Sequence, residues 1–143
     1  MTKTVFISKA KRRLALVWLI GIALPGALLF VQSMMGFYGD DGAEVGRWFI
    51  AAVSPTGGLI LAVLVADAGG PTPPDRRVGA LIFQIALGVS LLYLAALWLL
   101  ILYARAADGG VLALTREMGM WLTALQGAVT LVLGVFFVRR KEA

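Results

Sequence analysis

The sequence predicts an all-α integral membrane protein, a bundle of four transmembrane helices, and three observations support this fold class. The composition is 60% hydrophobic over 143 residues, with a mean hydropathy of +0.89, which leaves too little polar surface for a water-soluble fold. The apolar residues also lack the strict alternation that is typical of barrel strands. Finally, they form four long segments without Asp, Glu, Lys or Arg, at residues 14–35, 48–66, 78–103 and 120–138.

Each segment is long enough to cross a bilayer, because about 20 residues with a rise of about 1.5 Å span a hydrocarbon core about 30 Å thick. We therefore expect a single membrane domain over residues 14–138, flanked by basic tails at residues 1–13 and 139–143. The first segment is longer than the apolar core of a signal peptide, so we interpret it as a retained helix. The other pieces are too short to form a separate soluble domain.

The distribution of basic residues predicts that both termini are cytoplasmic, because Lys and Arg concentrate in short cytoplasmic loops. With the N-terminus inside, ten of the thirteen basic residues lie on the cytoplasmic side, and the outer face keeps only Arg47, Arg105 and Arg116. The net charge of +5 then follows from topology and from attraction to anionic headgroups. The basic residues flank helices and form no recognition motif, so we expect no nucleic-acid partner.

Two of the predicted helices contain proline. In the first helix, Pro25 cannot donate to the carbonyl of Gly21 and predicts a kink. The second helix combines Pro55 with Gly57 and Gly58, which predicts a break over residues 54–58, where the helix should locally unwind or bend. A broken helix at membrane depth is tolerated when it is buried in protein or lines a cavity, and in transporters it marks binding sites.

Small residues recur on two of the predicted helices, which favours close helix packing. The second helix has them every four residues and the fourth at a spacing of seven, and together the two stripes comprise Ser54, Gly58, Ala62, Ala66, Gly127 and Gly134. The loop at residues 39–44 is acidic but lacks the ligand spacing of a calcium loop, so we interpret it as a cap for the second helix. The loop before the fourth helix is expected to hold a short surface segment at residues 111–114.

Polar side chains from three helices are predicted to share one depth in the outer half of the membrane. An amide without a partner would cost several kcal/mol in lipid, so these side chains should point inward and meet each other or water. Two interpretations remain open: internal hydrogen bonds within one bundle, or the lining of a pore. The residues of this polar layer are Gln32, Ser54, Thr56, Thr123 and Gln126.

Enzymatic activity is not expected. The chain has no Cys and no His, and no charged side chain lies within the four segments, so a nucleophile at Ser54 or Thr56 would have no base. No catalytic residue, metal ligand or cofactor site is therefore predicted. The lack of a titratable group at depth also argues against proton-coupled exchange.

Three functions fit the sequence. The first is a pore or ion channel of the bacterial inner membrane, formed by a homo-oligomer. Such a small protein would suit a membrane effector that a partner triggers in a defence or toxin-like system. The second is a non-conducting anchor or scaffold subunit of a larger complex, whose basic residues contact lipid or a cytoplasmic protein. The third is a small solute transporter, which rests on the predicted break at residues 54–58.

Overall fold

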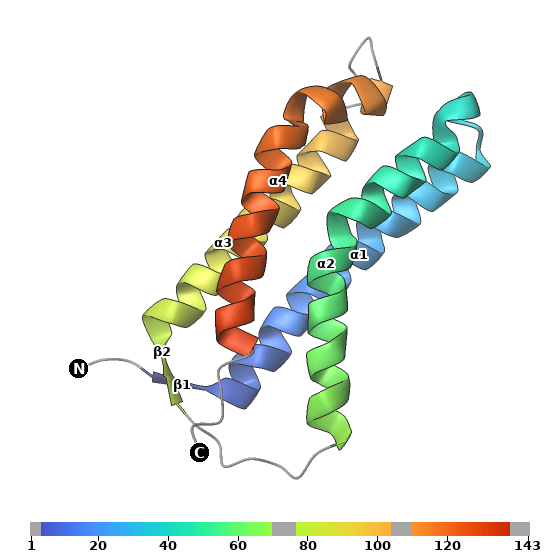
Figure 1. Cartoon of the computed structure of the whole chain (residues 1–143). Helices are drawn as coiled ribbons and strands as arrows, with labels where there is room; N and C mark the ends of the chain where they lie inside the picture. The colour runs from blue at the N-terminus through green and yellow to red at the C-terminus, as the bar shows by residue number, and fades with distance from the viewer. Residues whose placement is uncertain (1–3, 70–76, 104–109, 138–143) are drawn as a thin grey trace.

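The computed structural model describes residues 4–69, 77–103 and 110–137, and this part of the chain is almost entirely helical. A short 3₁₀ helix, η1 (Gly39–Asp41), leads into the second long helix. The long helices lie side by side and alternate in direction, as Figure 1 shows. They are α1 (Ile7–Met34), α2 (Gly42–Gly69), α3 (Ala80–Tyr103) and α4 (Gly110–Phe137).

Three helical segments are long and apolar enough to cross a membrane: Ser8–Met34, Gly39–Val65 and Ala80–Tyr103. The helical fold and these three candidate spans confirm the coarse fold prediction. The fourth predicted segment, residues 120–138, lies in α4 but ends outside the described residues, so its crossing stays a prediction, as does the orientation of the termini.

Three helices begin earlier in the structure than in the prediction. Residues 7–13, predicted as part of a basic tail, form the first turns of α1, because Lys and Arg are good helix formers that continue a helix into the headgroup region. The expected surface segment at residues 111–114 belongs to α4. Figure 1 shows these first turns of α4 running at an angle to the rest of the helix.

A small two-stranded sheet, absent from the prediction, joins the N-terminus to the start of α3. Strand β1 (Thr4–Phe6) pairs antiparallel with β2 (Arg77–Gly79). The pair satisfies backbone groups where the chain enters two helices. It also places the starts of α1 and α3 at the same end of the bundle (Figure 1).

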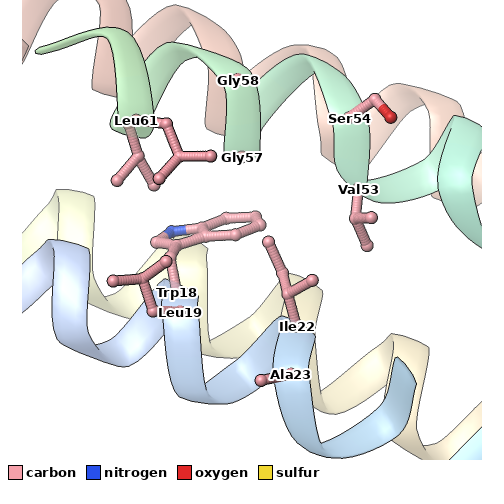
Figure 2. Close-up of a pocket in the computed structure, with 10 residues that line it drawn as sticks. Trp18, Leu19, Ile22, Ala23, Val53, Ser54, Gly57, Gly58 and Leu61 are labelled. Carbon is pink, nitrogen blue, oxygen red and sulfur yellow. The ribbon is translucent and has the colours of Figure 1, made fainter. Parts of the chain in front are cut away.

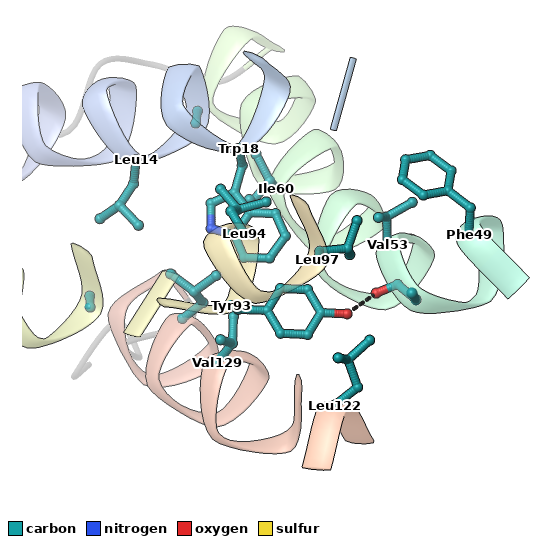
Figure 3. Close-up of a cluster of buried hydrophobic side chains, with 14 of the residues drawn as sticks. Leu14, Trp18, Phe49, Val53, Ile60, Tyr93, Leu94, Leu97, Leu122 and Val129 are labelled. Atoms are coloured by element: carbon teal, nitrogen blue, oxygen red, sulfur yellow. Dashed lines mark hydrogen bonds between the residues drawn. The ribbon is translucent and has the colours of Figure 1, made fainter. Parts of the chain in front are cut away.

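The core is filled by large side chains from all four helices. Trp18 of α1 stacks on Tyr93 of α3, with ring centroids 5.8 Å apart. Both side chains are fully buried, as are Ile60 of α2 and Leu133 of α4. Figure 3 shows the aromatic pair at the centre of this cluster. The described interior of a single copy is therefore a packed core.

Helix α2 is bent and not broken. Its helical conformation is continuous over Gly42–Gly69 with Pro55 inside, which corrects the predicted break at residues 54–58. Figure 1 shows α2 changing direction near its middle. Pro55 removes one backbone donor and its ring crowds the preceding turn, so the helix bends while its neighbouring bonds persist. Helix α1 is likewise continuous through Pro25.

Candidate functional site at the bend of the second helix

One backbone carbonyl at the bend connects three helices. The Tyr93 hydroxyl of α3 donates a hydrogen bond of 2.6 Å to the carbonyl of Ala52, and Gln126 Nε2 of α4 donates one of 2.7 Å to the same oxygen. Ala52 lies directly after Ala51, the residue whose carbonyl loses its usual donor at Pro55. The two side-chain donors therefore bind the carbonyl next to the one that Pro55 leaves without its helical donor.

Two buried polar atoms near the centre of the described chain have no hydrogen-bond partner. They are the hydroxyl of Thr56 and the indole nitrogen of Trp18, and both residues have no exposed surface. A buried polar group without a partner costs about 1–3 kcal/mol. Thr56 lies one turn after Ala52 on α2. The bend therefore holds both the Ala52 carbonyl, which accepts from two side chains, and the Thr56 hydroxyl, which has no hydrogen-bond partner.

A groove of about 540 Å³ lies between α1 and α2, beside the bend. Figure 2 shows the Trp18 indole lying across it beneath Gly57 and Gly58. The helices approach closely here, because a Cβ at Gly57 would lie 3.2 Å from Ile22 Cδ1. The lining is apolar except for Ser54 and comprises Trp18, Leu19, Ile22, Ala23, Val53, Ser54, Gly57, Gly58, Ile60 and Leu61.

The five predicted residues of the polar layer do not meet at one place. Thr56 and Gln126 lie toward the interior at the bend, whereas Gln32 is buried near the loop and accepts a hydrogen bond from the Tyr38 hydroxyl. Ser54 and Thr123 are exposed, and the Thr123 hydroxyl donates to its own helix at the Gly119 carbonyl, 2.8 Å away. Similar depth therefore does not bring these side chains together.

The two predicted packing stripes make no close contact within the described bundle. Ser54, Gly58, Ala62 and Gly127 are exposed, and a Cβ added at Gly58, Gly127 or Gly134 would meet no atom within 4 Å. The side chain of Ala66 lies outside the described residues.

The close helix contacts occur at other glycines. A Cβ at Gly21 would lie 2.5 Å from Leu94 Cδ1, so any larger residue here would require the Leu94 side chain to shift. A Cβ at Gly26 would lie 3.2 Å from the Phe49 ring. Gly21 lies on the same face of α1 as Pro25, four residues later, and this spacing was the available signal in the sequence.

Sequence reasoning also missed Tyr93, Ala52 and Trp18 as site residues. The available signal for Tyr93 was a hydroxyl near the middle of an apolar segment, which needs a partner when buried. The sequence does not predict a role for Ala52, because its contribution is a backbone oxygen that accepts two hydrogen bonds and not a side chain.

No protein-family model matches this chain, and comparisons with curated proteins and with solved structures also found no match. Among the described residues, no group of three or more His, Cys, Asp or Glu is arranged to hold a metal. The arrangement at the bend can hold helices in register and can accommodate an apolar group in the groove.

Proposed function

We propose that this chain is a non-conducting membrane subunit that anchors or scaffolds a larger assembly. The observation that supports this function is the use of Gln126 and Tyr93 inside one bundle, where both donate to the Ala52 carbonyl. Polar side chains that join helices internally are unavailable to a conduction pathway. The interior around them is occupied by the stacked rings of Trp18 and Tyr93.

The distribution of charge supports a placement in the bacterial inner membrane with both termini cytoplasmic. The start of α1 then presents Lys9, Arg12 and Arg13, all exposed, at the cytoplasmic surface. These side chains suit anionic lipid headgroups or an acidic surface of a cytoplasmic protein partner.

A homo-oligomeric pore is the second candidate, favoured by the exposure of Ser54 and Thr123 on different helices. Two different faces that meet head to tail form a ring of copies when the rotation between copies closes, and hydroxyl groups at such contacts can line a polar pathway. A partner-triggered effector would use a pore of this kind. A solute transporter loses its main support, because α2 is continuous.

The two candidates differ in what Gln126 and Thr123 do. We would reconstitute the purified protein in liposomes for single-channel recording and measure its mass and thermal unfolding in nanodiscs. For the scaffold, we expect currents no larger than those of empty liposomes, a lower unfolding temperature for Gln126→Leu and an unchanged one for Thr123→Val. Discrete currents that Thr123→Val or Ser54→Ala alters, with the oligomer intact, would establish the pore instead.

A further inference from the structure

We propose that the groove between α1 and α2 binds an acyl chain of an anionic phospholipid, whose phosphate is held by Arg12. This site does not depend on whether the protein is a scaffold or a pore.

The position and lining of the groove suit an acyl chain. Its residues belong to two candidate membrane spans, Ser8–Met34 and Gly39–Val65. Its volume of about 540 Å³ is within the range of about 300–1,000 Å³ that is typical of ligand pockets. At its edges Leu19 and Leu61 are 41% and 51% exposed, so the groove opens sideways toward the surrounding lipid.

The floor of the groove is held in place by the core. Trp18 is fully buried and stacks on Tyr93, whose hydroxyl is bonded to the Ala52 carbonyl beside the bend. The roof consists of Gly57 and Gly58, which carry no side chains to fill the space (Figure 2). A preformed apolar groove loses little conformational entropy when a chain enters it.

One exposed basic residue, Arg12, lies on the face of α1 that leads into the groove. It precedes Leu19 by seven residues, and residues at this spacing share one side of a helix. Seven residues correspond to about 10 Å along the axis, which places this charge on the headgroup side of the groove. A phospholipid joins a negative phosphate to an acyl chain in the same order, so charge and polarity are complementary.

The neighbouring basic residues serve as internal controls. Arg13 is exposed but lies about 100° further around α1 than Arg12. Lys9 is positioned over the Phe6 ring, 5.7 Å from its centroid. Only part of the basic cluster therefore faces the groove.

Fluorescence quenching can test the site, because Trp18 forms the floor. We would replace Trp48, Trp98 and Trp121 by Phe and reconstitute the protein in nanodiscs with acyl chains brominated on either phosphatidylglycerol or phosphatidylcholine. We expect stronger quenching by brominated phosphatidylglycerol at equal mole fraction. A juxtamembrane basic side chain contributes roughly a fivefold preference for anionic lipid, so Arg12→Gln should reduce the preference by about that factor and Arg13→Gln should leave it unchanged.

A second pair of variants tests the groove itself. Gly58→Leu should fill the groove and reduce quenching by both lipids, because Gly58 lines it and has space for a side chain. Gly88→Leu, at an exposed glycine of α3 with equal space around it, should have no effect. Equal quenching by the two lipids, equal effects of Arg12→Gln and Arg13→Gln, or quenching that Gly58→Leu does not change would overturn the proposal.

Native mass spectrometry of the unaltered chain gives an independent result if the triple Trp variant does not fold. Preferential retention of phosphatidylglycerol that Arg12→Gln reduces and Arg13→Gln preserves supports the site. Equal retention of phosphatidylglycerol and phosphatidylcholine contradicts it.

Discussion

At the scale of single residues, the Ala52 carbonyl of α2 is bonded to side chains of both α3 and α4. It accepts hydrogen bonds from Tyr93 at 2.6 Å and from Gln126 at 2.7 Å. Both donors reach the same oxygen, which in the continuous helix α2 is also the usual acceptor of the Thr56 N–H. Either donor alone keeps this oxygen bonded to another helix, and we therefore expect the two side chains to substitute partly for each other.

Replacing both donors should cost more than the sum of the single replacements. Hydrogen bonds between membrane helices contribute about 0.6 kcal/mol on average and at most about 1.7, so Gln126→Leu and Tyr93→Phe should each lower stability by an amount in this range. The double variant should exceed their sum, because it removes both interhelical donors from the Ala52 carbonyl. Reversible unfolding in bicelles or nanodiscs measures the three free energies.

Thr123→Val is the matched control for this cycle. Its hydroxyl bonds only to its own helix at Gly119 and is exposed, so its loss should change stability little. Strict additivity of Gln126→Leu and Tyr93→Phe would show that the shared carbonyl does not couple them.

Gly21 makes the closest contact between α1 and α3, and Gly21→Ala should be destabilising. The added Cβ would lie 2.5 Å from Leu94 Cδ1, and Leu94 is itself only 5% exposed. Overpacking of this kind typically costs about 1–3 kcal/mol. Gly88→Ala on α3 meets no atom and should instead stabilise its helix by up to about 1 kcal/mol. The same unfolding measurement compares the two, and equal effects would mean that the α1–α3 contact is not tight.

At the scale of elements, the bend of α2 brings the Ala52 carbonyl and the groove together. The sequence located this irregularity correctly, since Pro55 lies inside the helix, but it predicted a break. Loss of one donor at a proline is a local cost, whereas loss of a whole helical turn would leave several backbone groups without partners in lipid. A bend keeps the other backbone bonds of α2 and therefore costs less than a break.

Pro55→Ala should straighten α2, because alanine restores the backbone donor toward Ala51. The chain has no Cys, so spin labels can be attached at Ala43→Cys and Val65→Cys, which are exposed near the two ends of α2. Twenty-two residues of straight helix span about 33 Å, and we expect the pulsed electron resonance distance to increase toward this value in Pro55→Ala. Pro25→Ala in α1 should leave the distance unaltered. An unchanged distance in Pro55→Ala would assign the bend to packing alone.

At the scale of the whole molecule, contacts at both ends define an alternating arrangement of helices. The β1–β2 pair joins the starts of α1 and α3 at one end (Figure 1). At the opposite end, Arg116 at the start of α4 lies 3.9 Å from Glu44 at the start of α2. Both side chains are more than half exposed, so this ion pair contributes little to stability, but it shows that the two charges lie at the same end of the bundle.

Cysteine labelling in spheroplasts tests the predicted orientation and the fourth crossing. We expect Ala43→Cys and Glu117→Cys to react with an impermeant maleimide in intact spheroplasts, because the starts of α2 and α4 face outward in the predicted topology. Gly79→Cys in β2 and Glu142→Cys should react only after permeabilisation. Reaction of Glu142→Cys in intact spheroplasts would show that residues 120–138 do not cross the membrane, and a reversed pattern at every site would show inverted topology.

The sequence by itself determined a helical fold with three segments long and apolar enough to cross a membrane, because charge-free apolar segments of bilayer length have few other stable states. It also located the proline inside the second helix. Only the tertiary structure decided which way each side chain faces: Gln126 turns to the Ala52 carbonyl, whereas Ser54 and Thr123 stay exposed. The reason is that lipid outside and protein inside are both apolar, so hydrophobic periodicity does not distinguish the inner face of a membrane helix from its outer face. Packing around Gly21, Trp18 and Tyr93 makes that choice.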